Sequence, residues 1–209
     1  MSDDEITKEK ILSACKDRFM REGFARVSVD EISNELAMSK KTFYKHFSSK
    51  EDLVQQIVER FMGEIRGNIE RILLSENTAV EKLSETMTTI AMAAGKVLPF
   101  FGQDVRKRLP DLWKRIEEFR RERISEIFNR LIDQGISEGY MRQDLNRRVL
   151  LLCLFSAVDG IIQPHVLVAE SFSVSEGIRG ILNIFFRGVL TQSGVDQFDR
   201  LTSRAYQPQ

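Results

Sequence analysis

The chain has 209 residues, 42% of them hydrophobic and 30% charged, and its 31 basic residues balance 31 acidic ones. Such a composition is typical of a globular protein that buries a core of its own. Because the net charge is zero, there is no global attraction to nucleic acid or membranes, and any anion-binding surface has to be a local patch. The longest uncharged apolar run, residues 149–158, is too short for a membrane span. The acidic, polar first residues are unlike a signal peptide, so we expect a cytoplasmic protein without membrane contact.

The sequence offers little to a catalytic or metal-binding hypothesis. Its two cysteines, Cys15 and Cys153, and its two histidines, His46 and His165, do not have the spacing of metal ligands. Both cysteines stand among apolar residues, where we expect buried, reduced thiols. Gly-rich phosphate loops and the G-x-S-x-G turn are absent from the sequence. We therefore predict no catalytic residue, no metal and no cofactor.

The first three elements are predicted to be helices joined by short turns. Apolar residues from Ile11 to Phe19 form one helical stripe, and Gly23 is typical of the residue that ends such a helix. Ser28 and Glu31 have the spacing of a capping box at the start of a short second helix. Ser39 is the candidate cap of a third helix with the sequence KKTFYKHF.

The rest of the chain also has helical periodicity, which predicts an all-α protein. A fourth helix starts near Ser49, and its apolar residues recur every four positions from Leu53 to Ile72. Further helices are predicted over residues 80–94, 99–109, 110–135, 144–162 and 173–190. We expect Gly135 to end one of them, Asp144 to cap the next, and the segment after Gly194 to be frayed.

The segment SKKTFYKHFSSKEDL, residues 39–53, combines four lysines with three aromatic residues. On a helix, Phe43 and Phe47 share one face and are expected to enter a small core with Phe19 and Leu36. The remaining circumference presents lysine, hydroxyl and imidazole groups, a combination that fits the major groove of DNA. Together with the preceding helix and the turn AMS, it is predicted to form a helix-turn-helix. A lysine-rich face is also commonly only a solvated surface, and lysine content alone does not separate the two interpretations.

The run of residues 11–58 resembles the tetracycline-repressor (TetR) family of bacterial transcriptional regulators. The resemblance is carried by the Phe-x-x-x-Gly-Phe segment at 19–24, by Phe43-Tyr44 and His46-Phe47, and by Lys50-Glu51-x-Leu53. It implies a three-helix, helix-turn-helix DNA-binding head over residues 1–52. A larger helical domain for effector binding and dimerisation would then occupy residues 53–209. The implied function is a ligand-responsive regulator of double-stranded operator DNA, in the first place a repressor that a small molecule releases.

The predicted DNA-binding residues come from the residue types and from this resemblance. The lysines are expected to neutralise phosphates. By resemblance, Thr42, Tyr44 and His46 lie against the DNA backbone and base edges, and Ser28 and Lys50 hold phosphates at helix starts. The complete predicted set is Ser28, Ser39, Lys40, Lys41, Thr42, Tyr44, Lys45, His46 and Lys50.

Two positions depart from the family pattern. The family usually has glycine where this chain has Ala37, and a left-handed conformation costs another residue about 1–2 kcal/mol. Either the turn is reshaped or this cost is tolerated. The family often has glycine where this chain has Lys41, so Lys41 is a candidate for an additional DNA contact.

Two late helices, residues 146–162 and 174–190, are too apolar for one-sided surface helices. Deep burial within one chain is one explanation. The other is pairing with a second copy in a four-helix bundle, which we favour because a helix-turn-helix protein needs a dimer to span two half-sites. The residues predicted for this homodimer interface are Leu151, Phe155, Val158, Ile181 and Phe185.

Aromatic residues and methionines lie between the head and these helices in the sequence. They are either plain core or the lining of the effector pocket that the family has in this region, and such a lining suits an apolar or aromatic effector. The predicted pocket residues are Phe61, Ile65, Met87, Met92, Phe101, Trp113 and Phe119. Asp104 and Glu117 are candidate counter-charges for the effector, or parts of a solvated face.

Two other classes of function compete with a DNA-binding regulator. A small-molecule-binding helical bundle whose head has lost DNA affinity would be consistent with Ala37. An all-helical enzyme would need a buried acid–base pair, which the sequence does not reveal.

Overall fold

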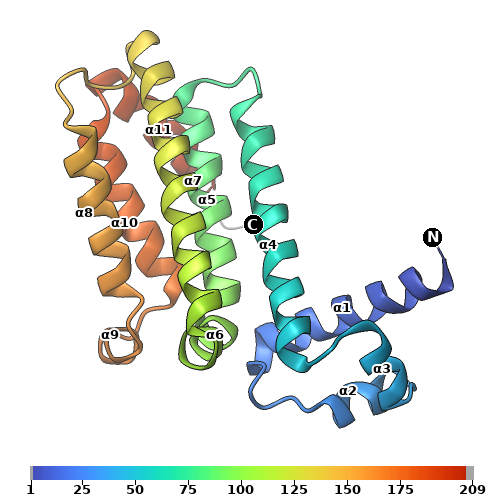
Figure 1. The fold of residues 1–209 in the computed structure, drawn as a ribbon. Helices are drawn as coiled ribbons and strands as arrows, with labels where there is room; N and C mark the ends of the chain where they lie inside the picture. Colours follow the sequence, from blue (N-terminus) through green and yellow to red (C-terminus); the bar gives the residue numbers. More distant parts are fainter. Residues whose placement is uncertain (1, 206–209) are drawn as a thin grey trace. The chain divides into compact units, whose positions relative to one another are not determined.

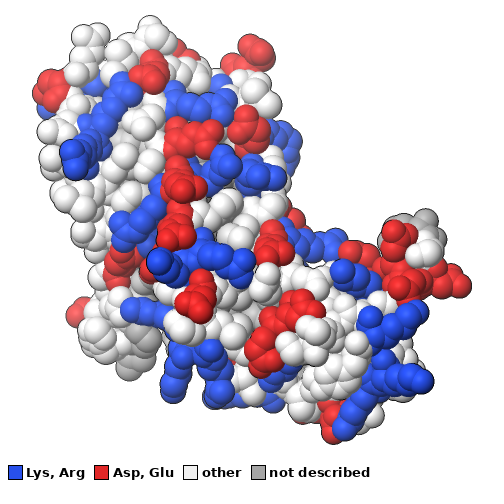
Figure 2. Space-filling model, in the orientation of Figure 1, with Lys and Arg blue, Asp and Glu red and all other residues white. Residues whose placement is uncertain are grey.

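The computed structural model describes residues 2–205, except the side chains of residues 164, 168 and 203–205. Every regular element in this range is a helix (Figure 1), which confirms the all-α prediction. The helices are α1 (Asp3–Glu22), α2 (Val29–Glu35), α3 (Lys40–His46), α4 (Lys50–Leu73), α5 (Ala79–Val97), the π-helix η1 (Leu98–Gly102), α6 (Gln103–Arg108), α7 (Pro110–Ser137), α8 (Arg147–Ile161), α9 (Pro164–Glu170), α10 (Val174–Val189) and α11 (Gln192–Ala205). Basic and acidic side chains are interspersed over the visible surface (Figure 2), as the balanced charge requires.

The chain forms two compact units. The head unit comprises residues 1–64 and 96–117, and the body unit comprises residues 65–95 and 118–209. The boundary predicted at residue 52 lies close to the start of α4, whereas the head unit also takes most of α4, η1 and α6. These segments belong to the head because their apolar side chains complete its core.

The core of the head unit is aromatic. Phe43 and Phe47 are buried in it together with Phe19, as their helical spacing predicts. Phe101 of η1 is also buried here, with its ring centroid 6.4 Å from that of Phe19 and 6.2 Å from that of Phe24. Ring pairs at such separations add to the stabilisation from buried apolar area. This cluster fixes one face of α3 toward the protein.

Gly23 ends α1 as predicted, and its surroundings also require glycine. Its φ is 79°, and a Cβ at this position would lie 2.5 Å from Oδ2 of Asp104 on α6. The same Oδ2 accepts a hydrogen bond from the backbone N–H of Ala25, at 2.8 Å. Asp104 therefore anchors the loop between α1 and α2 to α6, which is a different role from the effector counter-charge considered from sequence.

In the body unit, α8 and α10 pack against each other (Figure 1). The segment after Gly194 is helical, so the expectation of a frayed end is wrong for residues up to 205. The reason is tertiary: the Phe198 side chain is fully buried, and the Gln197 side chain donates a hydrogen bond to the Thr78 hydroxyl at 3.0 Å.

Two predicted helix boundaries are wrong. The helix α7 continues through Gly135 to Ser137, and Gly135 is needed because a Cβ there would lie 2.5 Å from the Met141 side chain. The cap of α8 is Asn146, whose side chain accepts from the N–H of Val149 at 3.2 Å. Asp144 instead forms an ion pair with Arg142 at 2.7 Å.

The two cysteines have different environments. Cys15 is buried in the head core as expected, and burial raises the pKa of its thiol to about 12. Cys153 is exposed on α8, so the expectation that it is buried is wrong. The apolar residues around Cys153 in the sequence include several that the body unit leaves uncovered on the same helix.

Replacing Gly23 with alanine should destabilise the protein, because the backbone conformation alone costs a non-glycine residue about 1–3 kcal/mol and the Cβ would collide with Asp104. A matched control is Gly67→Ala in α4, where a Cβ meets nothing within 4 Å. The control should stabilise the protein by up to about 1 kcal/mol. Urea unfolding followed by circular dichroism measures both changes, and equal effects of the two substitutions would contradict this account of Gly23.

Candidate DNA-binding surface

Ser28 caps the N-terminus of α2. The Ser28 hydroxyl accepts from the N–H of Glu31 at 3.2 Å, and the Glu31 carboxylate accepts from the N–H of Ser28 at 2.7 Å. This is the capping box predicted from the sequence. The hydrogen bonds from Ser28 lower the pKa of the Glu31 carboxyl. Ser28 itself is exposed, which leaves it accessible at this helix start.

The turn between α2 and α3 has the conformation for which the family usually supplies glycine. Ala37 has φ 50°, in the left-handed region. The N–H of Met38 donates to the Ser33 carbonyl at 2.9 Å, and the N–H of Ala37 donates to the Asn34 carbonyl at 3.1 Å. Of the two alternatives for Ala37, the turn is therefore not reshaped, and the conformational cost is tolerated.

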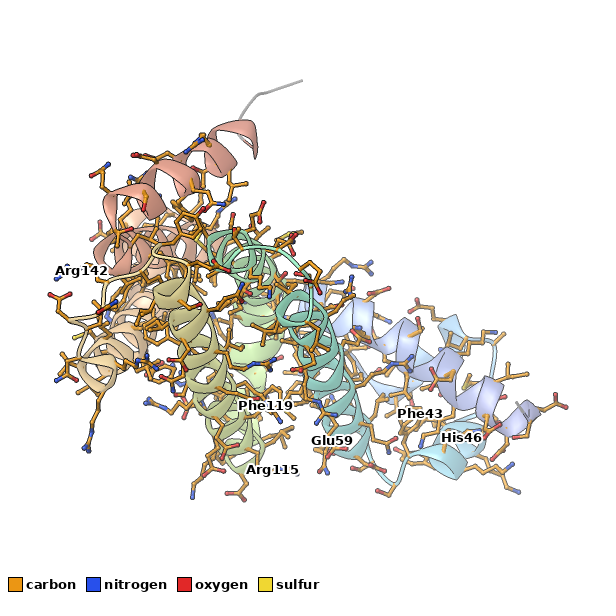
Figure 3. All side chains as sticks on the ribbon, turned by 90° about the horizontal axis from the view of Figure 1, so that it is seen from above. Phe43, His46, Glu59, Arg115, Phe119 and Arg142 are labelled. Atoms are coloured by element: carbon orange, nitrogen blue, oxygen red, sulfur yellow. The ribbon has the colours of Figure 1, made fainter. Side chains whose placement is uncertain are left out.

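The position of α3 follows from its cap and its buried face. The Ser39 hydroxyl accepts from the N–H of Thr42 at 3.0 Å, and Phe43, labelled in Figure 3, is fully buried in the head core. With Phe43 facing the core, Lys40, Lys41, Tyr44 and Lys45 are exposed to solvent. These four side chains form the outer face of α3.

Two lysines of the outer face already have acidic partners within the head unit. Lys40 pairs with Asp30 of α2 at 2.6 Å, and Lys45 pairs with Asp4 of α1. Lys41 has no ion-pair or hydrogen-bond partner among residues 2–205. Lys41 is thus the lysine of this face that an incoming phosphate meets without displacing another group.

His46 and Lys50 are turned toward the protein. The His46 side chain is 5% exposed, and its Nε2 lies 3.8 Å from Oδ1 of Asp4. The Lys50 ammonium donates to the carbonyls of Phe24 and Val27, at 3.1 and 3.0 Å. In this structure, His46 lies against α1, and Lys50 ties the start of α4 to the loop between α1 and α2. Their predicted DNA contacts remain predictions, as do those of Ser39 and the partly exposed Thr42.

Sequence reasoning missed the acidic residues that pair with α3. Asp4 and Asp30 are distant from Lys45 and Lys40 in the sequence, and nothing local marks them as partners. The exposed Arg26, two residues before Ser28, was also missed. The sequence signal for Asp4 is the acidic start of the chain at residues 3–5.

The seven predicted pocket residues do not line one cavity. Phe101 is in the head core, and Phe61 and Trp113 pack against that core. Met87 is buried in the body unit, while Met92 is 69% exposed. The periodicity of apolar side chains predicts burial, but it does not say which elements cover them.

Ile65 and Phe119 do come together, in a cleft between α4 and α7 of the body unit. Figure 3 labels Phe119 on α7. Its lining is apolar in the middle and charged at the edge. It comprises Ile65, Ile69, Leu73, Phe119 and Ile127 together with Arg66, Glu70, Arg123 and Glu126. Three of the charged side chains form ion pairs, because Glu70 pairs with Arg130 at 3.3 Å and Arg123 pairs with Glu126.

The predicted dimer residues divide into two groups. Phe155 and Ile181 are buried within their own chain, so they do not offer a free surface. Leu151, Val158 and Phe185 are partly exposed. The strongly exposed apolar residues of these helices are their neighbours Val149, Leu152 and Ile184, with Leu152 63% and Ile184 75% exposed. Two of the five predicted residues therefore face inward, and the dimer interface on these helices remains a prediction.

Two further features bear on the class of protein. Among the described residues, no group of three or more His, Cys, Asp or Glu side chains is arranged to hold a metal ion. Likewise, no helix within the described range is long and apolar enough to cross a membrane.

The head unit has the two short helices, the tight turn and the exposed basic helix of a helix-turn-helix DNA-binding protein. The family profile described as bacterial regulatory proteins, tetR family, matches residues 11–57. Residues 11–57 of the head unit therefore match the DNA-binding region of the TetR family of transcriptional regulators.

Similar proteins extend beyond the head. The fatty acid metabolism regulator protein of Bacillus subtilis is 20% identical over 183 residues, which are 86% of this chain and 94% of that protein. The transcriptional repressor KstR2 of Mycolicibacterium smegmatis is 24% identical over 144 residues, or 66% of this chain and 69% of the repressor. A transcriptional regulator from Cytophaga hutchinsonii has the same fold, with a TM-score of 0.69 and 18% identity over 88% of this chain and 98% of its own.

Replacing Ala37 with glycine should stabilise the protein by up to about 1 kcal/mol. The left-handed conformation costs alanine about 1–2 kcal/mol, and the greater freedom of glycine in the unfolded chain offsets part of the gain. The control Ala14→Gly in the interior of α1 should have the opposite sign, with a loss of about 1 kcal/mol. Thermal unfolding measures both, and a destabilised Ala37→Gly variant would contradict the strain at this turn.

Proposed function

We propose that the protein is a repressor that binds operator DNA as a homodimer through α2 and α3 and is released by a small molecule bound in the body unit. The observation that carries this proposal is the orientation of α3. Its inner face is held by buried Phe43, and its outer face presents Lys41, Tyr44 and Lys45 to solvent. The relative named as a transcriptional repressor supports the sign of regulation.

The outer face of α3 combines the two kinds of contact that a DNA reader needs. Lysine ammonium groups neutralise phosphates and supply affinity that is independent of sequence. Tyr44, 52% exposed, and Thr42 carry hydroxyl groups that reach the backbone or base edges from the same helix. Ser28 and Ser39 lie at the starts of α2 and α3, where backbone N–H groups and the helix dipole favour phosphate.

The homodimer is proposed to form through the uncovered side of α8 and α10. Val149, Leu152 and Ile184 are more than half exposed on these two packed helices, which is costly for an isolated chain in water. Covering them with the same surface of a second copy gives an isologous interface with two-fold symmetry. A helix-turn-helix dimer of this symmetry reads two half-sites about one DNA turn apart.

The effector is proposed to bind in the cleft between α4 and α7. The cleft has an apolar middle of Ile65, Ile69 and Ile127 and a cavity volume of about 20 Å³, so an apolar or aromatic ligand has to widen it on binding. A relative named for fatty acid metabolism makes fatty acids reasonable members of a first ligand panel. The helix α4 carries the cleft residues and also, in its first turn, Lys50 of the head, so it is the element through which we expect the effector to act.

The alternative of a helical bundle that has lost DNA affinity loses its main support. It rested on Ala37, and Ala37 keeps the left-handed turn that glycine has in the family. The left-handed conformation at Ala37 therefore does not argue against a helix-turn-helix in this chain.

Replacing Lys41 with alanine should weaken DNA binding and its salt dependence. The affinity of the wild type for a duplex from the region upstream of its own gene should fall steeply with salt, with a log–log slope several units negative. Lys41→Ala should flatten this slope by about one unit per subunit. The control is Lys10→Ala, an exposed lysine of α1 with the same change of charge. Fluorescence anisotropy measures both, and a wild-type affinity independent of salt would contradict the proposed DNA surface.

Replacing Leu152 with glutamate should produce a folded monomer, because the charge enters the proposed interface but not the core of the chain. Phe155→Glu should instead unfold the protein, since Phe155 is buried within its own chain. Light scattering and circular dichroism distinguish these outcomes.

Cys153 provides an independent readout of the same interface. In a dimer its maleimide labelling should be slow, and in Leu152→Glu it should be fast, with buried Cys15 as the unreactive internal reference. A monomeric wild type, or a Leu152→Glu dimer with slow labelling, would contradict the interface.

Replacing Ile65 with tryptophan should fill the cleft and abolish the response to effector without changing DNA affinity in its absence. A panel of fatty acids and substituted benzoic acids is first screened by thermal unfolding, where ligand at about 100 times its Kd stabilises by about 2.7 kcal/mol. Anisotropy then measures DNA release by any ligand found. Met92→Trp, at an exposed position of α5, is the control and should respond normally. The cleft would be the wrong site if Ile65→Trp responded normally or if Met92→Trp lost the response.

A further inference from the structure

The acidic first turn of α1 lies against the basic outer face of α3. Asp4 is in that first turn, between Asp3 and Glu5. The Lys45 ammonium donates a hydrogen bond to Oδ1 of Asp4, and Nε2 of His46 lies 3.8 Å from the same oxygen. Figure 2 shows acidic and basic side chains close together at this end of the head unit. One carboxylate thus faces two of the side chains predicted to meet DNA.

This pair contributes little to holding the head together. The side chains of Lys45 and Asp4 are 66% and 56% exposed, and ion pairs in such positions have small effects on folding because water competes with both partners. The head core of buried aromatic side chains fixes α1 and α3 without it. The Lys45 hydrogen bond lowers the pKa of the Asp4 carboxyl, so Asp4 is charged at neutral pH. Asp4 is therefore charged when it meets Lys45 at neutral pH, and another anion can replace it in this exposed contact.

A carboxylate and a phosphate oxygen bind a lysine ammonium in the same way. Both are anionic acceptors of a charge-assisted hydrogen bond, and one ammonium held by the first is less available to the second. For Lys45 to bind a phosphate, the Asp4 carboxylate must be displaced or remain close to the phosphate as a like charge. Each of these alternatives reduces the affinity for DNA.

We propose that Asp4 is an intramolecular competitor of the DNA phosphate for Lys45, and that it lowers the affinity of the head for DNA. This inference depends on the proposed binding of DNA by the outer face of α3. In the free protein, Asp4 occupies Lys45, and DNA takes over this position on binding. Asp4 does not itself bind DNA, and it acts through the availability of Lys45. Lys41, which has no partner among the described residues, meets no such competition.

The test is Asp4→Asn, with Asp3→Asn as the matched control. Both substitutions remove one negative charge from the first turn of α1, and the Asp3 side chain has no ion-pair or hydrogen-bond partner among residues 2–205. Asp4→Asn should raise DNA affinity by about two- to fivefold per subunit at low salt, the range for loss of an exposed ion pair. Asp3→Asn should raise it less, because only long-range repulsion is removed. Anisotropy on the upstream duplex and on a scrambled duplex of the same length measures both.

Salt and a second substitution separate competition from a structural effect. The gain from Asp4→Asn should shrink as salt is raised, because ions screen the competing pair. In a Lys45→Gln background, Asp4→Asn should change affinity no more than Asp3→Asn does, because the contested ammonium is gone. A gain from Asp4→Asn that is no larger than that from Asp3→Asn, or that persists in Lys45→Gln, would overturn the inference.

The proposed DNA surface and this inference fail in different ways. If the wild type binds neither duplex, or binds with a salt-independent affinity, the DNA surface on α3 is wrong and the inference falls with it. If Lys41→Ala and Lys45→Gln weaken binding while Asp4→Asn leaves it unchanged, the surface stands and only the role of Asp4 is wrong.

Discussion

The burial of Phe43 in the aromatic core of the head is the constraint on which the proposed DNA-binding surface depends. A seven-residue helix has little stability of its own, so its orientation has to come from packing. Phe43 and Phe47 provide it by entering a core that Phe19, Phe24 and Phe101 complete. Once that face is inside, the positions of the lysines and of Tyr44 on the opposite face follow from helical geometry.

Acidic residues of the head unit form ion pairs with the basic residues of α3. Asp30 pairs with Lys40 and Asp4 with Lys45, while the ammonium of Lys50 is satisfied by two backbone carbonyls. A basic face in a chain of zero net charge is thus partly neutralised before any DNA arrives. In the proposed complex with DNA, these lysines would exchange the carboxylates of their own chain for phosphates.

The body unit has two apolar surfaces that a single chain leaves open. One is the side of α8 and α10 with Leu152 and Ile184, and the other is the cleft between α4 and α7. They differ in shape and in their surroundings. The first is an exposed apolar face on two packed helices, where we propose the dimer contact, and the second is a small cleft edged with charged side chains, where we propose the effector site. The proposed dimer and effector sites follow from this difference.

The sequence by itself determined the helical class, the capping box at Ser28, and the inward orientation of Phe43 and Phe47. These features depend on residues a few positions apart, and helical geometry brings such residues together in any environment. For the same reason, the resemblance of residues 11–58 to the family was enough to predict the helix-turn-helix.

Only the tertiary structure decided which surfaces cover which residues. Phe101 has the pattern of a pocket residue but is buried in the head core, and Phe155 has that of an interface residue but faces its own chain. Gly135 is a packing position inside α7 because Met141 approaches it, and Asp4 is a partner of Lys45 although α1 and α3 are far apart in the sequence. Periodicity predicts that a side chain is buried, whereas the identity of its neighbour depends on contacts between distant segments, which no local pattern contains.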